Sequence, residues 1–310
     1  ETDSISLSLE KGKKYKLVAE YFDGGGSASA KLYWRVPDTD QRAVIDLYGE
    51  AGNIMRKCDL TVAVLGINQS IEREGQDRSS IELPKEQQAF IEEAYKINPN
   101  TVVVLVAGSS LAINWMDEHI PAIVNAWYPG EAGGTAITEV LFGDYNPAGR
   151  LPVSVPRSVG QIPVYYNKKA PRNHDYVEQA ASPLYTFGYG LSYTTFEYSD
   201  LQVIRKSPCH FEVAFKVKNT GSYDGEEVAQ LYLRDEYASV VQPLRQLKCF
   251  ERFFLKRGEE KEIFFTLTEK DLSIIDRNMT RVVETGGFRI MIGASSDDIR
   301  LTKDISVESL

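Results

Sequence analysis

The sequence predicts an α/β sandwich with a mainly parallel sheet, followed by an all-β sandwich of the immunoglobulin type. Short apolar runs alternate with segments of helical spacing through residues 41–165, as they do in α/β layers. Residues 199–310 instead alternate apolar and polar residues between turn signals, which is typical of β-sandwiches. The chain has 310 residues, 43% of them hydrophobic, and this is enough for two separate cores.

The first 40 residues form a segment of a third kind. Alternating runs at residues 5–9, 15–22 and 28–35 indicate β-strands. Three strands with one apolar face are too few for a stable domain. We therefore expect residues 1–40 to be the last strands of a β domain that begins upstream.

Residues 41–165 contain the elements of the α/β layer in alternating order. Helical spacing occurs at 41–58, 85–98 and 133–142, and strand-like apolar runs occur at 60–65, 101–107 and 122–127. This alternation favours a mainly parallel sheet with helices on both faces. Glycine and polar residues follow each apolar run. Because ligands bind beyond the carboxyl ends of strands in open α/β sheets, we expect the functional edge there.

A segment rich in proline and tyrosine follows the α/β layer. We expect residues 166–198 to be a linker that wraps over the α/β surface, because the segment has many aromatic residues and few charges. Strand-like alternation then begins, with runs at 211–219, 229–233, 261–267, 287–293 and 301–307. No cluster of chemically active residues stands out in residues 199–310, so we interpret this part as a structural domain.

The composition excludes several classes of partner and cofactor. The net charge of −9 and the pI near 5.1 argue against nucleic acid or an anionic membrane as a partner. No apolar run is long enough to span a bilayer. Cys58, Cys209 and Cys249 are widely spaced, and we expect small buried hydrophobic residues rather than a disulfide framework. The histidines are equally scattered, so we expect neither a metal nor another cofactor.

Residues 66–78, directly after the first apolar run, hold the densest charge of the α/β part. The loop contains Glu72, Arg73, Glu74, Asp77 and Arg78. Charges this close together at a strand end are typical of a functional site. A solvated surface loop with internal ion pairs is the alternative interpretation, and composition does not separate the two.

Together with five further segments, this loop carries a family resemblance. The segments are 71–78, 81–84, 98–104, 126–134, 141–152 and 187–196. From about residue 45 onward the chain resembles the glycoside hydrolase family 3 β-glucosidases and β-xylosidases. The resemblance implies a (β/α)8 barrel, an α/β sandwich and a fibronectin-III-like domain, in that order along the full-length enzyme. Residues 1–40 look like the end of a PA14 domain, which some members carry inside the α/β sandwich.

The resemblance also implies a mechanism and a place for one catalytic group. Family members retain anomeric configuration by using an aspartate nucleophile on the barrel, which is not in this chain, and a glutamate acid/base from the α/β domain. The pattern Glu-Gly-x-Asp-Arg places that acid/base at Glu74, and Glu72, two residues earlier, is the alternative. For Glu72, Asp77 and Arg78 we favour ion pairing that stabilises the loop.

The implied activity is hydrolysis of β-glucosides or β-linked oligosaccharides once the barrel domain is present. β-Xylosidase activity is the alternative within the family, and a non-catalytic carbohydrate-binding or scaffold protein is the alternative outside it. Trp127 and Tyr128 lie at a predicted strand end, where they either contact sugar or pack in the core. Polysaccharide-degrading relatives favour a periplasmic or secreted location, although the three unpaired cysteines also fit the cytoplasm.

Overall fold

The computed structural model describes residue 10, residues 12–16, residue 18 and residues 47–169 and 175–308. The chain divides into two compact units, Glu1–Gly49 and Glu50–Leu310. The strands predicted at 5–9 and 28–35, most of the strand at 15–22 and the start of the helix at 41–58 lie outside the described residues.

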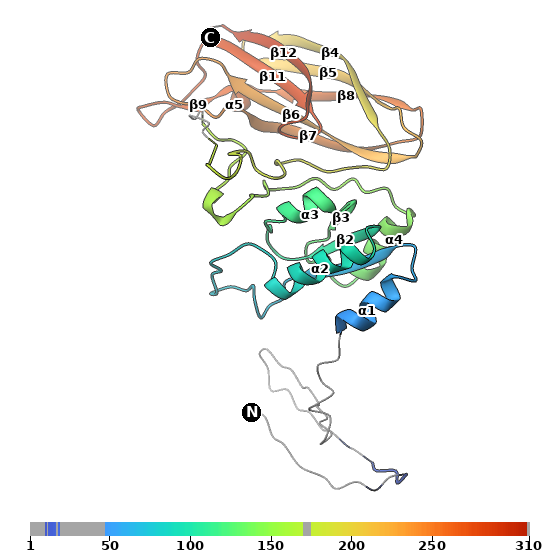
Figure 1. Ribbon diagram of the computed structural model, residues 1–310. Helices are drawn as coiled ribbons and strands as arrows, with labels where there is room; N and C mark the ends of the chain where they lie inside the picture. Colours follow the sequence, from blue (N-terminus) through green and yellow to red (C-terminus); the bar gives the residue numbers. More distant parts are fainter. Residues whose placement is uncertain (1–9, 11, 17, 19–46, 170–174, 309–310) are drawn as a thin grey trace. The chain divides into compact units, whose positions relative to one another are not determined.

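The α/β part has the alternating order that the sequence predicts. Its elements are α1 (Leu47–Met55), β1 (Thr61–Gly66), α2 (Lys85–Ile97), β2 (Thr101–Val106), α3 (Asn114–His119), β3 (Ala122–Asn125) and α4 (Gly133–Phe142) (Figure 1). Helix α3 was not predicted. The strand predicted at 122–127 ends two residues earlier, because Trp127 leaves extended geometry with a φ of 51°.

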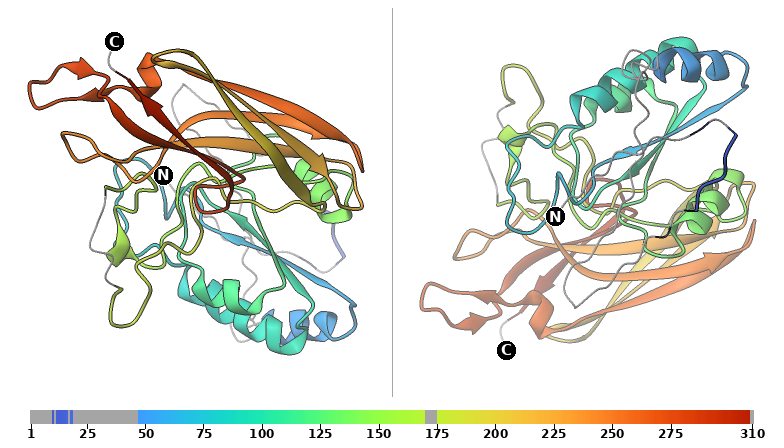
Figure 2. Two further views of the ribbon diagram at one scale, coloured as in Figure 1. Left: turned by 90° about the horizontal axis from the view of Figure 1, so that it is seen from above. Right: turned by 90° about the horizontal axis from the view of Figure 1, so that it is seen from below.

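Within the described residues, β1, β2 and β3 form a parallel sheet in that order. Figure 2 shows α2 on one face of this sheet and α4 on the other, which confirms the predicted α/β layering. Ile91 and Ala94 of α2 are buried with Val103 and Leu105 of β2. These apolar residues recur at the helical and strand periods, so burying them fixes both elements against each other. The carboxyl ends of the strands therefore meet at one edge.

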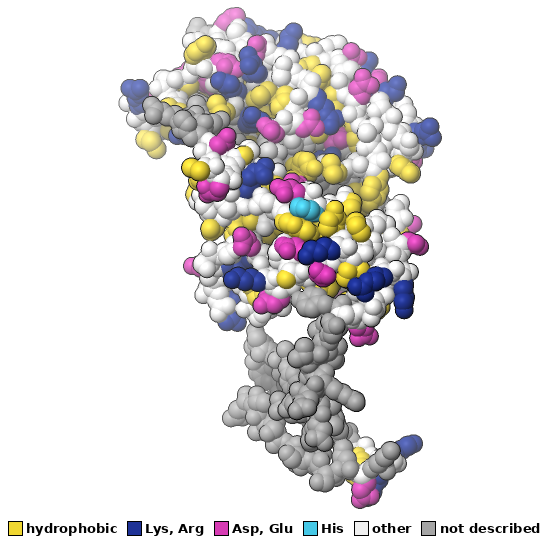
Figure 3. Space-filling model, in the orientation of Figure 1, with side chains coloured by type: hydrophobic (Ala, Val, Ile, Leu, Met, Phe, Trp, Pro, Cys, Tyr) yellow, Lys and Arg dark blue, Asp and Glu magenta, His cyan; other side chains and the backbone are white. Residues whose placement is uncertain are grey.

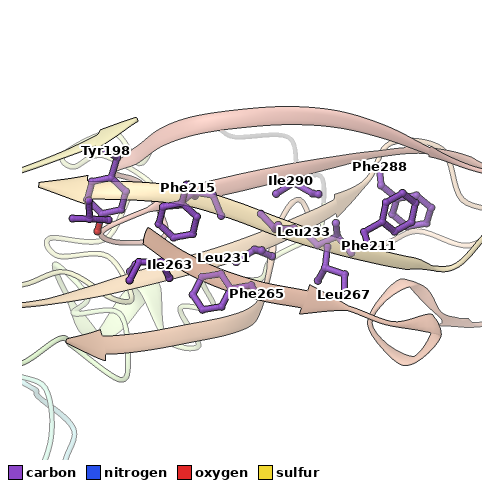
Figure 4. Close-up of a cluster of buried hydrophobic side chains, with 14 of the residues drawn as sticks. Tyr198, Phe211, Phe215, Leu231, Leu233, Ile263, Phe265, Leu267, Phe288 and Ile290 are labelled. Carbon is purple, nitrogen blue, oxygen red and sulfur yellow. The ribbon is translucent and has the colours of Figure 1, made fainter. Parts of the chain in front are cut away.

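Antiparallel strands make up the C-terminal part. They are β4 (Phe196–Ser207), β5 (His210–Asn219), β6 (Gly225–Asp235), β7 (Gln246–Leu255), β8 (Glu260–Leu267), β9 (Ile274–Ile275), β10 (Arg281–Val282), β11 (Gly286–Gly293) and β12 (Ile299–Val307), with the short helix α5 (Glu269–Leu272) after β8. One sheet has the order β4-β5-β8 and another the order β12-β11-β6-β7. Phe215, Leu231 and Ile263 pack in the buried cluster shown in Figure 4. This arrangement confirms the predicted all-β sandwich.

The segment between the two parts follows the end of the α/β layer closely. Val155 bridges Tyr185, and Leu151 N–H donates to the Tyr189 carbonyl at 2.8 Å. A 3-10 turn, η1, occurs in it at Val159–Gln161. Residues 185–189 therefore run alongside residues 151–155. Strand β4 begins at Phe196, which is inside the linker predicted for residues 166–198.

Acidic and basic side chains are interspersed over the visible face of the described residues (Figure 3). None of the helices in the described ranges combines the length and hydropathy of a membrane-spanning segment. The described part of the chain also contains no group of three His, Cys, Asp or Glu residues placed to hold a metal ion. The expectation for the cysteines is correct for Cys209, which is buried, and wrong for Cys58, which is exposed at the end of α1.

Candidate functional site

The charged loop begins where β1 ends and contains two successive turns. Strand β1 is held at Gly66 by the Gln87 amide of α2, which accepts from Gly66 N–H at 2.8 Å and donates to its carbonyl at 2.7 Å. Asn68 then organises the first turn: its carbonyl accepts from Glu72 N–H at 2.9 Å and its side chain from Ser70 N–H at 2.9 Å. Such side-chain bonds to local backbone favour turns over helix or strand.

Glu74 lies at the tip of the second turn. Gln76 N–H donates to the Arg73 carbonyl at 3.2 Å, which makes Glu74 and Gly75 the two central residues of a four-residue turn. Gly75 has a φ of 75°, as the third position of a type II turn requires, and glycine takes this conformation without strain. The Glu74 side chain is exposed. The turn therefore presents this carboxyl group outward from the carboxyl edge of the sheet.

A cavity of about 830 Å³ lies beside the turn. Its lining includes Gln76, Asp77 and Arg78 from the loop, together with Trp127. Glu74 is not among the described residues that line it. Ile162 and Val164, from the segment after the α/β layer, form another part of the wall. Nothing in the sequence pattern singled out these two residues, since they carry no chemistry and reach the cavity only through the fold.

Glu72 also lines this cavity, and its carboxylate has partners on several sides. Its Oε2 accepts from Gly108 N–H at 2.9 Å and from the Tyr128 hydroxyl at 3.1 Å. Its Oε1 lies 3.8 Å from Arg78 Nη2, and the Glu72 and Arg78 side chains are 19% and 16% exposed. Arg78 Nη2 also donates to Ser109 Oγ at 2.8 Å. The ion pairing predicted for Glu72 and Arg78 is present, but Asp77 has no described ion pair.

These contacts set the charge state of Glu72. Burial opposes ionisation of the carboxyl group, but hydrogen bonds from Ser109, Gly108 and Tyr128 and the positive charge of Arg78 outweigh it, so the pKa of Glu72 lies below its usual value. Partial burial, and then the carboxylate of Glu72, raise the pKa of Tyr128. At neutral pH the pair is thus a carboxylate accepting from a neutral phenol.

The packing around Glu72 is close. A Cβ on Gly108 would lie 2.6 Å from the Tyr128 ring and 3.1 Å from Glu72 Oε2, which is too close for a larger residue at position 108. Trp127 has a left-handed φ of 51°, a conformation that costs a bulky residue about 1–2 kcal/mol. The strained residue lines the cavity and directly precedes Tyr128. Neither aromatic residue belongs to the described α/β core cluster.

Sequence reasoning found the charged residues of this site but not their partners. Gly108 and Ser109 follow β2, and Tyr128 follows β3. The only signal for them was the expectation that the carboxyl ends of parallel strands share an edge. That expectation identifies the region, but it does not identify the contacts of Glu72 with Gly108 and Tyr128 or of Arg78 with Ser109.

Comparison with known proteins identifies the family. Residues 7–193 match the glycosyl hydrolase family 3 C-terminal domain, and residues 227–296 match a fibronectin type III-like domain. The PA14 likeness of residues 1–40 stays a prediction, because most of that segment falls within the first match.

Curated relatives and solved structures agree with this match. The chain is 38% identical over 285 residues to a periplasmic β-glucosidase of Salmonella typhimurium, covering 87% of the chain and 37% of the relative. It is 39% identical over 262 residues to a β-xylosidase of Formosa agariphila, covering 82% of the chain and 36% of the relative.

Among solved structures, a β-glucosidase from Erythrobacter marinus superposes with a TM-score of 0.81 at 38% identity, covering 86% of this chain and 37% of that one. A β-glucosidase from Listeria innocua in complex with isofagomine superposes with a TM-score of 0.79 at 31% identity, covering 84% and 38%. The chain thus spans well under half the length of these relatives. It belongs to glycoside hydrolase family 3 and contains the C-terminal domain of that family followed by a fibronectin type III-like domain.

Proposed function

We propose that this chain is the C-terminal part of a retaining exo-β-glycosidase, a β-glucosidase, in which Glu74 is the general acid/base. The nucleophile, an aspartate, belongs to a barrel domain outside the chain. The single observation that carries the assignment is the exposed turn at residues 73–76, which presents a carboxyl group from the carboxyl edge of the α/β sheet. The β-glucosidases among the relatives support the substrate class.

The contacts of the two neighbouring glutamates favour Glu74 over Glu72. Both oxygens of Glu72 already have partners, and its pKa is lowered by hydrogen bonds and by Arg78. A general acid must carry a proton at the pH of the reaction and must reach the leaving oxygen. The lowered pKa of Glu72 fails the first requirement, although Glu72 lines the cavity. The Glu74 side chain is exposed and can meet a substrate held by a second domain.

The proposed reaction has two steps. Protonated Glu74 donates its proton to the glycosidic oxygen while the barrel aspartate attacks the anomeric carbon, so the alcohol leaves and a glycosyl ester forms. Glu74, now a carboxylate, takes a proton from water as the water oxygen attacks the same carbon and releases the aspartate. In retaining enzymes the two carboxyl groups stand about 5–5.5 Å apart.

The test uses the full-length enzyme and an aryl β-glucoside. Glu74→Gln should lower kcat by about 10²–10⁴-fold, the usual contribution of general acid–base catalysis. In Glu74→Gly, azide should restore turnover and yield the β-glucosyl azide, because the anion attacks the glycosyl ester without needing a base. Glu82→Gln, an exposed carboxylate of the same loop region, is the matched control. Full activity of Glu74→Gln would refute the assignment.

β-Xylosidase activity is the second candidate, because a relative of that name is as similar to the chain as the β-glucosidases are. The ratio of kcat/KM for aryl β-glucoside and aryl β-xyloside in the full-length enzyme separates the two activities. A carbohydrate-binding role without catalysis predicts sugar binding and no turnover in the same assay. A periplasmic or secreted location is proposed, and the periplasmic β-glucosidase of Salmonella typhimurium supports it. The division into an α/β part at 41–165, a linker at 166–198 and a sandwich at 199–310 stays a proposal.

A further inference from the structure

One carboxylate connects the loops that follow all three described strands of the α/β sheet. Glu72 lies on the loop after β1, Gly108 follows β2 and Tyr128 follows β3. Glu72 Oε2 accepts from Gly108 N–H at 2.9 Å and from the Tyr128 hydroxyl at 3.1 Å. A carboxylate accepts several hydrogen bonds and donates none, which suits a position where a backbone amide and a phenol converge.

The same carboxylate also joins the two ends of the segment that carries Glu74. In the sequence, Glu72 directly precedes the turn at residues 73–76, and Arg78 follows it by two residues. Their side chains pair at 3.8 Å. Ser109 is shared between them: its hydroxyl accepts from Arg78 Nη2 at 2.8 Å and hydrogen-bonds Glu72. Both ends of the short segment that presents Glu74 are therefore tied to the residues that follow β2.

Burial and packing make this tie specific. The Glu72 and Arg78 side chains are less than one-fifth exposed, so solvent weakens their interaction less than it would on an open surface. There is no space for a Cβ at Gly108 between Glu72 and the Tyr128 ring. The Tyr128 hydroxyl also lies 3.2 Å from the Ile67 carbonyl, so its single proton is shared between that oxygen and Glu72. An apolar side chain at position 72 would leave the Gly108 N–H and Arg78 without this acceptor.

We propose that Glu72 is a positioning residue for the acid/base: its carboxylate, held by Gly108, Tyr128 and Arg78, fixes the turn that aims Glu74 at the leaving oxygen. This inference rests on the proposed function. Effective proton transfer needs the acid within hydrogen-bond reach of the oxygen, and a displacement of about 1 Å costs a rate factor near 10². An exposed four-residue turn needs a rigid base to meet that requirement.

The experiment compares two β-glucosides in the full-length enzyme, one with 2,4-dinitrophenol and one with a simple alcohol as leaving group. Dinitrophenolate leaves without a proton, but an alcohol requires one. Glu72→Ala should therefore lower kcat/KM for the alkyl glucoside by about 10- to 100-fold and change it little for the dinitrophenyl glucoside. Tyr128→Phe, which removes one of the hydrogen bonds to the Glu72 carboxylate, should show the same selectivity with a smaller loss than Glu72→Ala. Glu82→Gln should alter neither substrate.

Three readouts separate the possible outcomes. Equal fractional losses on both substrates would mean that Glu72 serves only folding, and no loss would mean that the turn does not need it; either result overturns the inference. Glu72→Gln keeps an acceptor oxygen for Gly108 N–H, so it should retain more activity than Glu72→Ala. If Glu72→Gln were as inactive as Glu72→Ala, and azide rescued Glu72→Ala, then Glu72 would be the acid/base itself.

Failure of the proposed function gives a different result. If Glu74→Gln shows no selectivity between the two leaving groups, Glu74 is not the acid and the premise fails. If Glu74→Gln shows the selectivity and the Glu72 and Tyr128 variants do not, the positioning role alone is wrong. Should Glu72→Ala fail to fold, as judged by its thermal transition, Tyr128→Phe decides the question, because loss of one hydroxyl leaves the carboxylate and its ion pair in place.

Discussion

Removing Glu227 should destabilise the chain far more than removing an exposed glutamate. Arg150, which follows α4, and Glu227 of β6 pair at 2.7 Å, and their side chains are only 9% and 3% exposed. Glu227 Oε1 also accepts from Val228 N–H at 2.7 Å. The pair joins the α/β part to the β-sandwich through two charges that are almost fully removed from water.

The expected magnitude follows from what Glu227→Ala leaves behind. The Arg150 guanidinium would stay buried without its counter-ion, and its Nε already has no hydrogen-bond partner among the described residues. Breaking a buried pair in this way costs about 3–5 kcal/mol. The matched control is Glu251→Ala, which breaks an exposed pair with Lys261 on the same sandwich, with side chains 38% and 44% exposed, and should cost at most about 1 kcal/mol.

Urea denaturation of the 310-residue chain, followed by circular dichroism, measures both free energies of unfolding. Arg150→Met combined with Glu227→Met should be more stable than Glu227→Ala, because no buried charge is then left unpaired. If Glu227→Ala and Glu251→Ala shift the urea midpoint equally, burial does not govern this ion pair and the reasoning is refuted.

Two further predictions concern the α/β part, and a third compares a cysteine of that part with one of the β-sandwich. Gly66→Ala should prevent β1 from pairing with β2, because its Cβ would lie 1.8 Å from a β2 carbonyl oxygen and its φ is 146°. Gly134→Ala in α4 meets no neighbour and should stabilise the chain by up to about 1 kcal/mol. The thermal transitions of the two variants measure both effects. Because the folded pKa of Glu72 is lowered from 4.5, its stabilising effect is present above pH 4.5 and is lost as pH falls through the folded value. The stability gap between wild type and Glu72→Gln should therefore shrink on acidification, and a constant gap would contradict it. Cys58 should react rapidly with a thiol reagent in the native chain while Cys209 reacts only after unfolding, as mass spectrometry of the labelled peptides would show.

The sequence predicted elements well where one local signal dominated. Strand β2 is apolar after Thr101 and flanked by breakers, and Gly143 caps the end of α4 in a left-handed conformation. The boundaries predicted from these signals were therefore nearly correct. Strand β7 was missed because Phe250 and Phe254 point to solvent, which hides its alternation, and a bulge shifts its register with β6. Helix α3 has only six residues and no side-chain cap at its start, so no local sequence pattern predicts it.

The candidate site was predictable only in its charged residues. The family pattern singled out Glu74, and the expected pairing of Glu72 with Arg78 is present. The amide of Gly108 and the hydroxyl of Tyr128 could not be anticipated, because their contacts with Glu72 depend on how the loops after β2 and β3 pack. A backbone amide leaves no mark in a sequence. The sequence placed Tyr128 at a strand end, as a sugar contact or a core residue, and did not indicate its bond to Glu72.

The β-sandwich also shapes the candidate site, although it supplies no charged group to it. Ile162 and Val164 line the cavity beside the Glu74 turn, and Tyr166 lies two residues further on. The Tyr166 hydroxyl accepts from Leu247 N–H of β7 at 3.2 Å, and its ring stacks on Phe187 at 4.1 Å. Because the segment is fixed to the sandwich at Tyr166, the position of that cavity wall depends on β7. The fibronectin type III-like domain is therefore connected to this cavity wall through the contact between Leu247 and Tyr166.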